Sequence, residues 1–444
     1  MIISIVIAKL TLFLLRLFKR GATTLPGKIA LKIKPDILTK LSCGVKIICI
    51  TGTNGKTTTC ALIEHALKSN GLSYLINKSG ANMITGVTTA FIENCTILGK
   101  CKKEYAILEC DENSLPLISS YINAEVLAVT NLFRDQLDRY GEINTTFQKI
   151  KLSAENLGGA ALVINADCPL TNSLSLGANN RVFTFGVNAD YPVSAPSDVR
   201  HCPVCSSELR YKSHVYAQLG DYYCPRCEYR RKTPDYYAES ISSSELGSVF
   251  IFNRRGEKQL CSTSLGGIYN VYNFCTAAAV LDVLGIEKTD CLCTFSGAFG
   301  RMERFKNGDK TVLLLLVKNP VGLTGCIRYV CKIKGELNIA FALNDNDADG
   351  RDVSWIWDSD FSPIKTKCPR VYTAGTRSLD MALRLKYDGI DVKSENIIDG
   401  EDYARLVETA KNCKCDLVIF STYTAMMKMR HGFIEAFGGK EFWK

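Results

Sequence analysis

Residues 45–59, with the sequence VKIICITGTNGKTTT, decide the fold of this 444-residue chain. Their first six residues form a short apolar run rich in β-branched side chains, which predicts a buried strand. A loop with two glycines follows directly, and apolar residues at helical spacing then continue to Gly71, a residue that suits the end of a helix. The order of strand, glycine loop and helix is typical of a site that binds phosphate groups at a helix N-terminus.

The residue types of this loop match the chemistry of a bound nucleotide. Gly52 and Gly55 let the backbone wrap a phosphate group, and Lys56 supplies a positive charge for the β- and γ-phosphates. Thr57 offers a hydroxyl to Mg²⁺ at the start of the helix. The spacing departs from the general G-x-x-x-x-G-K-[ST] loop, because Ile50 stands where the first glycine would be. The alternative is a glycine turn between a strand and a helix that binds nothing.

Strands alternate with helices along most of the chain. Beyond the loop, the apolar runs YAILEC, EVLAVT, ALVINA and RVFTFG are separated by helical or turn-rich segments, which predicts a doubly wound α/β domain with a parallel sheet. The runs TVLLLLV, ELNIAFAL, RVYTAG and DLVIFS repeat this alternation nearer the C-terminus. We therefore expect an N-terminal helical segment at residues 1–44, a central ATP-binding domain at 45–304 and a C-terminal α/β domain at 305–444.

The composition is that of a globular protein, with 46% apolar and 22% charged residues. The net charge of +9 is spread along the chain, so it suggests an anionic partner without indicating nucleic acid. Most of the twenty cysteines lie singly, many of them in apolar runs, which is typical of buried thiols in a reducing cytoplasm. Residues 1–18, MIISIVIAKLTLFLLRLF, predict a helix; Lys9 and Arg16 interrupt its apolar run, which favours a helix in the cytoplasm over the alternative of one that spans a membrane. This helix would either stay in the cytoplasm or rest on the inner face of the membrane.

Four further cysteines form two C-x-x-C knuckles near the middle of the chain. Cys202 and Cys205 form the first knuckle, and Cys224 and Cys227 form the second after eighteen intervening residues. This spacing predicts a zinc ribbon, inserted into the central domain at about residues 198–233, in which four thiolates hold one structural Zn²⁺. A redox-active pair of thiols is the alternative.

Several segments resemble blocks of the Mur ligase and folylpolyglutamate synthase superfamily. GTNGKTT resembles its nucleotide loop, and GANMITG, NLFRDQLDRYGE and YNVYNFCTAAA resemble later blocks in the expected order. Members of this superfamily use ATP and Mg²⁺ to activate a carboxylate as an acyl phosphate. The resemblance implies that ATP is contacted by Gly52, Thr53, Asn54, Gly55, Lys56, Thr57, Thr58, Asn270, Asn273 and Arg301.

The resemblance also gives a role to Glu109, which ends the predicted strand in YAILEC. In this superfamily the matching carboxylate helps the loop threonine, here Thr57, to hold Mg²⁺, and oxygen ligands suit that ion. The alternative is that Glu109 or Asp111 caps the helix that follows. Asn270 and Asn273 have the same alternative, since asparagine is a common helix cap.

Other features depart from the usual ligases of the superfamily. Only about 45 residues precede the loop, where those ligases have a whole domain for the uridine nucleotide of their substrate. The block DQLDRYG lacks both histidines of its family counterpart, and LVKNPVG retains only Asn319 and Pro320 of another family segment. These differences resemble the MurT group, whose members act on lipid II and condense ammonia with a D-glutamate carboxylate.

The segment 343–358, LNDNDADGRDVSWIWD, is also similar to that group. By this resemblance, Asp352 reaches a separate glutaminase subunit, GatD, and orients its catalytic histidine. Asp352 joins Lys56 and Glu109 as the expected catalytic residues. An exposed loop with solvated carboxylates is the alternative. Two other functions stay open: a ligase that adds an amino acid, and a zinc-ribbon ATPase that depends on nucleic acid, which the scarcity of interleaved basic and aromatic residues disfavours.

Overall fold

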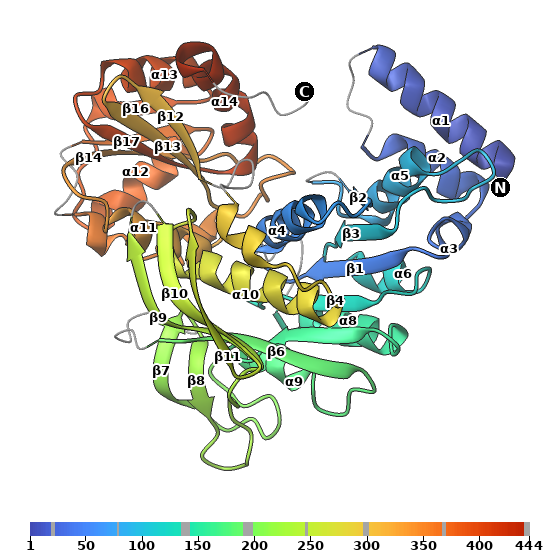
Figure 1. Ribbon diagram of the computed structural model, residues 1–444. Helices are drawn as coiled ribbons and strands as arrows, with labels where there is room; N and C mark the ends of the chain where they lie inside the picture. The colour runs from blue at the N-terminus through green and yellow to red at the C-terminus, as the bar shows by residue number, and fades with distance from the viewer. Residues whose placement is uncertain are drawn as a thin grey trace.

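The structure, a computed structural model, describes residues 1–18, 23–77, 80–134, 143–189, 199–244, 247–295, 302–365 and 370–438. Its described strands form a nine-stranded sheet, a six-stranded sheet and a two-stranded sheet. Figure 1 shows the six-stranded sheet and its helices as one unit beside the larger sheet, with the N-terminal helices at the far edge of the larger sheet. We call the nine-stranded part the central unit and the six-stranded part the second unit.

The central unit is built on a mixed sheet. Its strands are β1 Lys46–Thr51, β2 Tyr74–Ile76, β3 Tyr105–Glu109, β4 Val126–Val129, β5 Ala161–Asn165, β6 Arg181–Asn188, β9 Tyr236–Ser244, β10 Gly247–Arg254 and β11 Glu257–Thr263. They lie in the order β11-β10-β9-β6-β5-β4-β1-β3-β2. All neighbours from β2 to β9 pair in parallel, whereas β9, β10 and β11 pair antiparallel.

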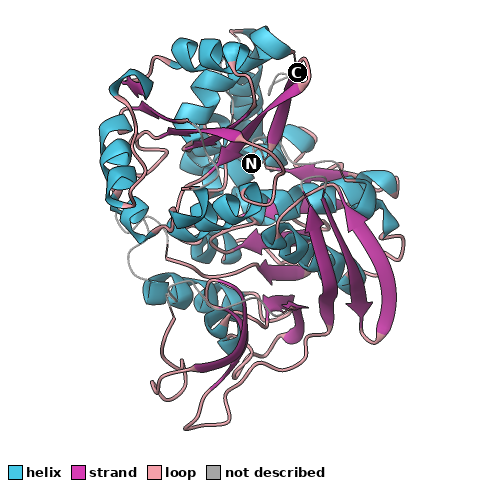
Figure 2. Ribbon diagram, turned by 90° about the vertical axis from the view of Figure 1, so that its left-hand side faces the viewer, coloured by secondary structure: helices cyan, strands magenta, loops and turns pink. Residues whose placement is uncertain are grey.

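Helices on both faces explain why the parallel strands are apolar throughout. Every residue of β1 except Lys46 is buried, and β3, β4 and β5 are buried along their full length. Helices α4 (Lys56–Ser69) and α10 (Ile268–Val283) pack together on one face. Helices α5 (Ile84–Asn94), α6 (Leu115–Ser119) and α8 (Ile143–Asn156) cover the other face, as right-handed crossovers require. Figure 2 shows helices flanking the strands of both large sheets.

Three helices precede the first strand. They are α1 Ile2–Leu17, α2 Leu25–Ile33 and α3 Ile37–Leu41. Helix α2 packs against α5, and α1 packs against both. No helix among the described residues combines the length and the apolar character needed to cross a membrane.

The second unit is a parallel sheet with one antiparallel edge strand. Its strands, in the order β12-β13-β17-β14-β15-β16, are β12 Glu303–Asn307, β13 Lys310–Leu316, β17 Asp416–Ser421, β14 Leu337–Ala342, β15 Val371–Gly375 and β16 Ile397–Asp399. Only β12 runs antiparallel to its neighbour.

The run TVLLLLV in this sheet is apolar because successive side chains enter two different cores. Leu313 and Leu315 pack into the core that contains α11 (Pro320–Val330) and α12 (Ser378–Tyr387). Val312 and Leu314 pack into the core on the other face, which contains α13 (Tyr403–Asn412) and α14 (Tyr423–Phe437).

A small hairpin carries the cysteine knuckles. Its strands are β7 (Arg210–Tyr216) and β8 (Leu219–Tyr223), and we call residues 199–231 the cysteine module. Arg231 anchors this module by donating to the buried carboxylate of Asp167 at 2.6 Å, and the Tyr272 hydroxyl donates to the same carboxylate at 2.6 Å. Burial raises the pKa of Asp167, and these two donors only partly counteract it.

The prediction of a doubly wound parallel sheet is confirmed for the strands β1 to β6. The three antiparallel strands β9 to β11 were not predicted. These strands mix buried with exposed positions, and the second half of β9 is a polar, serine-rich stretch whose sequence does not predict a strand. The central sheet is therefore mixed, not wholly parallel.

Candidate active site

The loop between β1 and α4 has a backbone that requires its two glycines. Gly52 and Gly55 have φ angles of 114° and 91°, in a left-handed region that side chains rarely adopt. A Cβ atom on Gly52 would collide with Thr130, and one on Gly55 would collide with the side-chain oxygen of Asn273. The loop thus lies directly against α10 and against the segment that follows β4.

That segment, residues 130–133, holds the loop in shape. The N–H of Thr53 donates to the Asn131 carbonyl at 2.9 Å, and the N–H of Asn54 donates to Asn131 Oδ1 at 2.9 Å. The Thr53 hydroxyl accepts from the N–H of Phe133 at 3.0 Å. Thr53 is only 4% exposed, so its side chain stabilises the loop instead of facing a ligand.

Lys56 lies in the first turn of α4, and its ammonium group is buried between two oxygens. Its Nζ donates to the Gly52 carbonyl at 2.6 Å and to Glu112 Oε1 at 2.7 Å. Burial alone would lower the pKa of Lys56, but Glu112 and, more weakly, Glu109 raise the pKa above its ordinary value. Lys56 therefore keeps its positive charge where the loop would receive phosphate groups.

Thr57 and Glu109 place two oxygen ligands side by side. The Thr57 hydroxyl donates to Glu109 Oε1 at 3.2 Å. Asn77 fixes the backbone of Glu109, because its Oδ1 accepts from the Glu109 N–H and its Nδ2 donates to the Glu109 carbonyl, each at 2.9 Å. A hydroxyl and a carboxylate beside a phosphate loop fit Mg²⁺, which prefers oxygen ligands and completes its shell with water and phosphate.

Asn270 and Asn273 lie inside α10 and are both buried. Asn273 Nδ2 donates to Asn270 Oδ1 at 3.2 Å, and Asn270 Nδ2 donates to the Gly266 carbonyl at 2.7 Å. Neither residue caps the helix, whose N-cap is Gly267, so the alternative of a helix cap is wrong. The Asn273 amide instead lies against the loop glycine Gly55, and both residues line the cavity beside it.

A cavity of about 80 Å³ lies between the loop, α10 and the second unit. Asn319 of the second unit reaches across, and its Nδ2 donates to Asn54 Oδ1 at 3.0 Å. The same Asn319 caps α11 by accepting from the Gly322 N–H at 2.8 Å. Ligand pockets usually enclose about 300–1,000 Å³. This cavity alone is therefore smaller than a usual ligand pocket.

The structure brings most of the expected ATP-binding residues around this cavity and loop. They are Gly52, Thr53, Asn54, Gly55, Lys56, Thr57, Thr58, Asn270 and Asn273. Arg301 lies outside the described residues, as does the block at 135–142. Sequence reasoning missed Glu112 and Asn77. The acidic run ECDE was a signal for Glu112, but nothing in the sequence marks Asn77 as the support of Glu109.

Asp352 lies in the second unit, just before the short 3-10 helix η2 (Ser354–Asp358). Its Oδ1 accepts from the Ser354 N–H at 2.8 Å. Hydrogen bonding by Ser354 lowers the pKa of Asp352 below its ordinary value, so the carboxylate is ionised at neutral pH. Arg134, which follows the segment that shapes the loop, pairs with Asp358 at 3.2 Å, so η2 lies against the central unit.

Helix α12 exposes a row of apolar side chains beside η2. Leu379, Leu383 and Tyr387 recur every four residues and are 60%, 50% and 74% exposed. Trp357 of η2 contacts the ring of Tyr387, with 5.4 Å between ring centroids. We call these four residues the α12 patch. Adjacent exposed side chains of this size are typical of a surface that binds another protein.

The four knuckle cysteines meet in the cysteine module. The sulfur atoms of Cys202, Cys205, Cys224 and Cys227 all lie within 4.8 Å of one another. Cys202 pairs with Cys227 at 3.7 Å, and Cys205 pairs with Cys224 at 3.4 Å, so sulfurs from the two knuckles face each other. Four free thiols in this arrangement fit a tetrahedral metal site.

Comparisons with known proteins show which family the chain is similar to. A family model described as "MurT ligase C-terminal" matches residues 316–426, and one described as "Mur ligase middle domain" matches residues 50–214. Over 431 residues the chain is 36% identical to "Lipid II isoglutaminyl synthase (glutamine-hydrolyzing) subunit MurT" of Streptococcus pneumoniae, which covers 94% of this chain and 93% of that protein. The protein of the same description from Staphylococcus aureus is 35% identical over 429 residues, or 95% of this chain and 94% of that protein.

Similar solved structures place the fold among the Mur ligases. A pseudomurein peptide ligase type C from Methanothermus fervidus superposes with a TM-score of 0.70 at 21% identity, covering 90% of this chain and 80% of that one. A MurF ligase from Thermotoga maritima in complex with ADP superposes with a TM-score of 0.64 at 13% identity, covering 92% and 83%. At these identities the likeness shows the fold alone.

Proposed function

The chain belongs to the MurT family of ATP-dependent Mur-type ligases, and from this membership we propose that it is the synthetase subunit of a lipid II isoglutaminyl synthase. Its substrate is the stem peptide of lipid II, in which it converts the α-carboxylate of D-glutamate to an amide. This places the chain in peptidoglycan biosynthesis. ATP drives the reaction and ammonia supplies the nitrogen.

The reaction has two steps at the loop between β1 and α4. A carboxylate oxygen of the substrate first attacks the γ-phosphorus of ATP, which forms an acyl phosphate and releases ADP. Ammonia then attacks the acyl carbon, phosphate leaves with the electron pair of the broken C–O bond, and the nitrogen loses one proton, which the released phosphate takes up. Lys56 stabilises the charge that develops on the transferred phosphoryl group. When bound at Thr57 and Glu109, Mg²⁺ supplies a Lewis acid for the same group.

Glu112 acts on this chemistry only through Lys56. Its carboxylate is 3% exposed and lies 2.7 Å from the ammonium group, which keeps Lys56 charged and pointed at the loop. Lys56 Nζ now donates to the Gly52 carbonyl of the loop. A phosphate group bound in the loop would accept this hydrogen bond in place of that carbonyl. We therefore assign Glu112 a positioning role.

Glutamine is the source of ammonia, and a separate GatD-type glutaminase subunit hydrolyses it. Asp352 reaches the partner's catalytic histidine and stabilises the imidazolium that forms when the cysteine nucleophile is deprotonated. Two features support this role: the hydrogen bond from Ser354 lowers the pKa of Asp352 and so favours its charged form, and the α12 patch offers an apolar docking surface next to η2. The partner would cover Leu383 and Tyr387 while its active site faces η2.

The four cysteines bind a structural Zn²⁺ that organises the module between β6 and β9. All four positions of a tetrahedral site are filled by thiolates, which leaves no position for chemistry. The chain works in the cytoplasm, at the inner face of the membrane where lipid II lies, and needs no nucleic acid.

The identity to the MurT subunits over nearly the whole chain carries this proposal. It is tested by incubating the chain and its glutaminase partner with lipid II, ATP, Mg²⁺ and glutamine, and by analysing the stem peptide by mass spectrometry. We expect conversion of D-glutamate to D-isoglutamine with release of ADP. ADP release driven by an amino acid, with no release driven by ammonium, would instead identify a ligase that extends a peptide.

A further inference from the structure

Helix α1 has apolar side chains on two opposite faces, and the protein covers only one of them. Ile5, Ala8 and Leu12 form the inner face and are buried against the neighbouring helices. The outer face is exposed along the whole helix and its C-terminal end. Its side chains with their exposed fractions are Ile2 48%, Ile3 71%, Val6 45%, Ile7 39%, Leu10 56%, Phe13 62%, Leu14 43%, Leu17 63% and Phe18 69%.

Polar contacts on the inner side fix which face points outward. The Ser4 hydroxyl, which is fully buried, donates to the Ala30 carbonyl of α2 at 3.1 Å. Near the other end of the helix, Arg16 forms an ion pair with Glu93 of α5. Rotation of α1 to bury its outer face would break both contacts, so the exposed side chains need an occupant other than this chain's own core.

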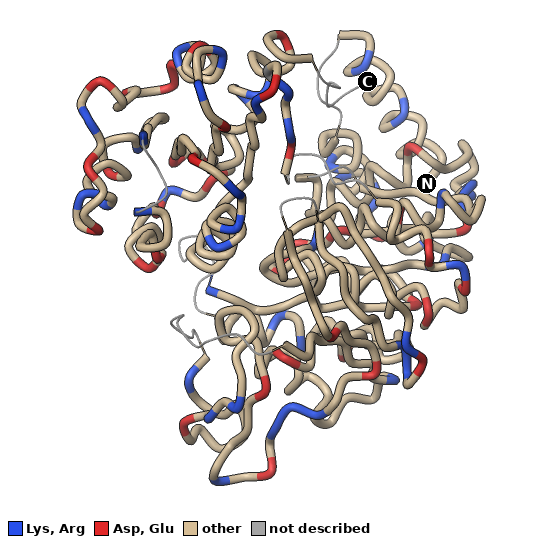
Figure 3. Tube along the Cα trace, turned by 60° about the vertical axis from the view of Figure 1, so that its left-hand side comes forward, with Lys and Arg blue, Asp and Glu red and all other residues tan. Residues whose placement is uncertain are grey.

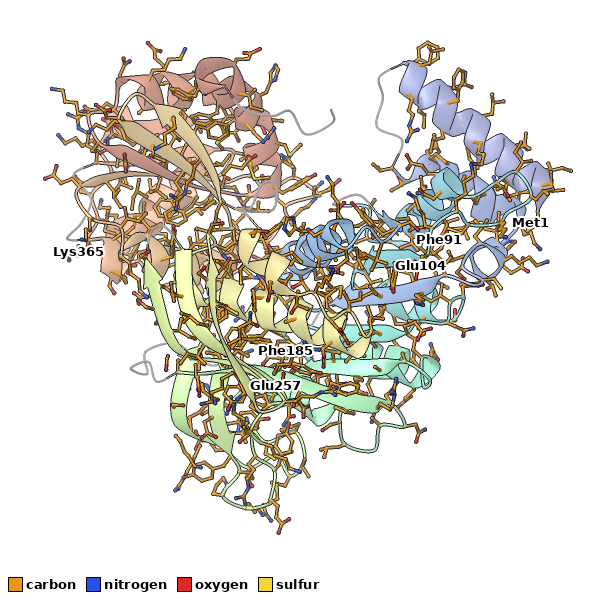
Figure 4. All side chains as sticks on the ribbon, in the orientation of Figure 1. Met1, Phe91, Glu104, Phe185, Glu257 and Lys365 are labelled. Atoms are coloured by element: carbon orange, nitrogen blue, oxygen red, sulfur yellow. The ribbon has the colours of Figure 1, made fainter. Side chains whose placement is uncertain are left out.

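A short hairpin at residues 95–101, closed by a bridge between Cys95 and Cys101, extends the apolar surface. Ile97 and Leu98 at its tip are 57% and 71% exposed. The tip lies against the start of α1, because a Cβ atom on Gly99 would lie 3.1 Å from the Met1 side chain and 3.3 Å from that of Ile5. Figure 4 shows Met1 at the outer edge of the molecule, with side chains projecting outward along α1. We call the outer face of α1 together with Ile97 and Leu98 the α1 surface.

The N-terminal segment that contains α1 is strongly basic in sequence. Residues 1–44 contain one acidic residue, Asp36, and that residue pairs with Lys34. The basic residues of the same segment are Lys9, Arg16, Lys19, Arg20, Lys28, Lys32, Lys34 and Lys40. Lys100 and Lys102, beside the hairpin tip, are exposed as well. Figure 3 shows the basic positions along α1 and in the segments near the N-terminus.

We propose that the α1 surface docks the chain on a bilayer that contains anionic lipids. At about 1.5 Å per residue, the 16 residues of α1 span about 24 Å, which is less than the roughly 30 Å of a hydrocarbon core, so the helix lies in the interface. Large apolar side chains enter the acyl boundary, and the surrounding lysines contact lipid phosphates. The charge complementarity selects this occupant, since a second copy of the chain would bring the same positive charge against itself.

This docking deepens the proposed function and rests on it, because lipid II is itself anchored in the bilayer. A chain held at the membrane needs only to capture a headgroup that diffuses in two dimensions. The surface is built from residues that contact neither the loop nor the α12 patch, so its loss leaves the chemistry intact.

The test is co-sedimentation of the full chain with vesicles of equal parts phosphatidylglycerol and phosphatidylcholine. The wild type is expected to bind these vesicles, and to bind pure phosphatidylcholine vesicles at least about tenfold more weakly, because each lysine loses its anionic partner. Leu10→Glu/Phe13→Glu should also reduce binding at least about tenfold, since two large apolar side chains no longer enter the bilayer. Lys100→Gln/Lys102→Gln should reduce binding to the anionic vesicles only.

Leu260→Glu is the matched control, because Leu260 is 73% exposed but lies on the edge strand β11. Equal binding by wild type and Leu10→Glu/Phe13→Glu would overturn the proposal. The proposal would also be overturned if sedimentation velocity showed that the wild type is a dimer and that Leu10→Glu/Phe13→Glu is a monomer. A second copy of the chain would then cover the α1 surface. Leu10→Glu/Phe13→Glu should amidate a water-soluble lipid II analogue as fast as the wild type. If the proposed function were wrong, the amidation assay would fail for the wild type as well, whereas vesicle binding would be unaffected.

Discussion

Lys56 and Glu112 form a buried ion pair at the loop between β1 and α4. Changes to this pair should therefore affect both the free energy of unfolding and the proposed amidation activity. Lys56→Met leaves Glu112 buried and unpaired, which should lower the free energy of unfolding by about 3–5 kcal/mol. The variant Lys56→Met/Glu112→Gln should recover part of that loss but no activity, because Lys56 acts on the phosphoryl group. Chemical denaturation and ADP release measure the two effects. Full turnover by either variant would contradict the assignment of the loop.

The pH dependence of the same pair follows from the raised pKa of Lys56. A lysine whose pKa is higher in the folded state stabilises that state fully below its unfolded pKa, and the stabilisation is lost as pH rises through the folded pKa. The stability difference between wild type and Lys56→Met/Glu112→Gln, in which neither side chain of the pair titrates, should therefore be constant across neutral pH and narrow only above about pH 10.4. A difference that disappears near neutral pH would show that Lys56 is not paired as described.

Gly55 tests the contact between the loop and α10. Gly55→Ala should lower stability by about 1–2 kcal/mol through its left-handed backbone, and it should also weaken ATP binding because the new methyl group displaces Asn273. Gly71→Ala is the matched control, since Gly71 has a φ of 69° and open space around it. Titration with a nonhydrolysable ATP analogue separates the two variants. Equal affinities would mean that Asn273 does not contact the nucleotide.

The functional role of a single residue could be predicted only where the chemistry requires particular residue types at a fixed spacing along the chain. The loop glycines, Lys56 and Thr57 could be named because a phosphate site needs them in sequence next to one another. Asn77 could not, because its two hydrogen bonds to Glu109 exist only once β2 pairs with β3. The hydrogen-bond partners that shape the loop, Asn131 and Phe133, come from the segment after β4, and their proximity to the loop also depends on strand order.

At the scale of elements, the cysteine module is expected to depend on its metal. Cys202→Ser or Cys224→Ser should reduce soluble yield and zinc content, because a structural site contributes to the folding of the segment that it organises. Cys95→Ser is the control, since Cys95 is a buried thiol outside the module. Metal analysis of the purified protein makes the measurement. Fully active wild-type protein that contains no zinc would refute the metal site.

The α12 patch should carry the contact with the glutaminase. Leu383→Glu is expected to weaken assembly of the two subunits by at least about tenfold, since it places a charge in the centre of an apolar contact. Leu152→Glu is a matched control, because Leu152 has nearly the same exposure on a helix of the central unit. Isothermal titration of the chain with its partner gives both affinities. If the two variants bound equally, the partner would have to dock elsewhere.

The strands that could be predicted from the sequence are mainly those that other elements cover on both faces of the sheet. A strand covered by helices on both faces is a continuous apolar run, and each such run from YAILEC to DLVIFS is a strand in the structure. Strands β9 to β11 mix buried with exposed positions, so their sequences are partly polar. Local pattern alone does not separate such strands from loops.

At the scale of the molecule, the site lies where two separately built sheets meet. Asn319 caps a helix of the second unit and also bonds to Asn54 of the loop, so the second unit contributes directly to the cavity that we propose binds the nucleotide. The alternation of strands and helices indicated two α/β parts, but the sequence contains no signal for how they face each other. Asn319 was one of two residues retained from a family segment, and its contact with the loop gives that retention a physical reason.

The two-chain amidotransferase is tested most directly by Asp352→Asn in the complex, assayed with glutamine and then with ammonium. Because an amide cannot stabilise the partner's imidazolium, glutamine-driven amidation should fall by on the order of 10⁴-fold, the loss seen when a serine-protease triad undergoes the same change. High ammonium should restore product in Asp352→Asn, since the phosphate loop is intact, and should fail to restore it in Lys56→Met. If glutamine and ammonium were impaired equally by Asp352→Asn, Asp352 would belong to the synthetase site or to the fold, and the cross-subunit role would be wrong.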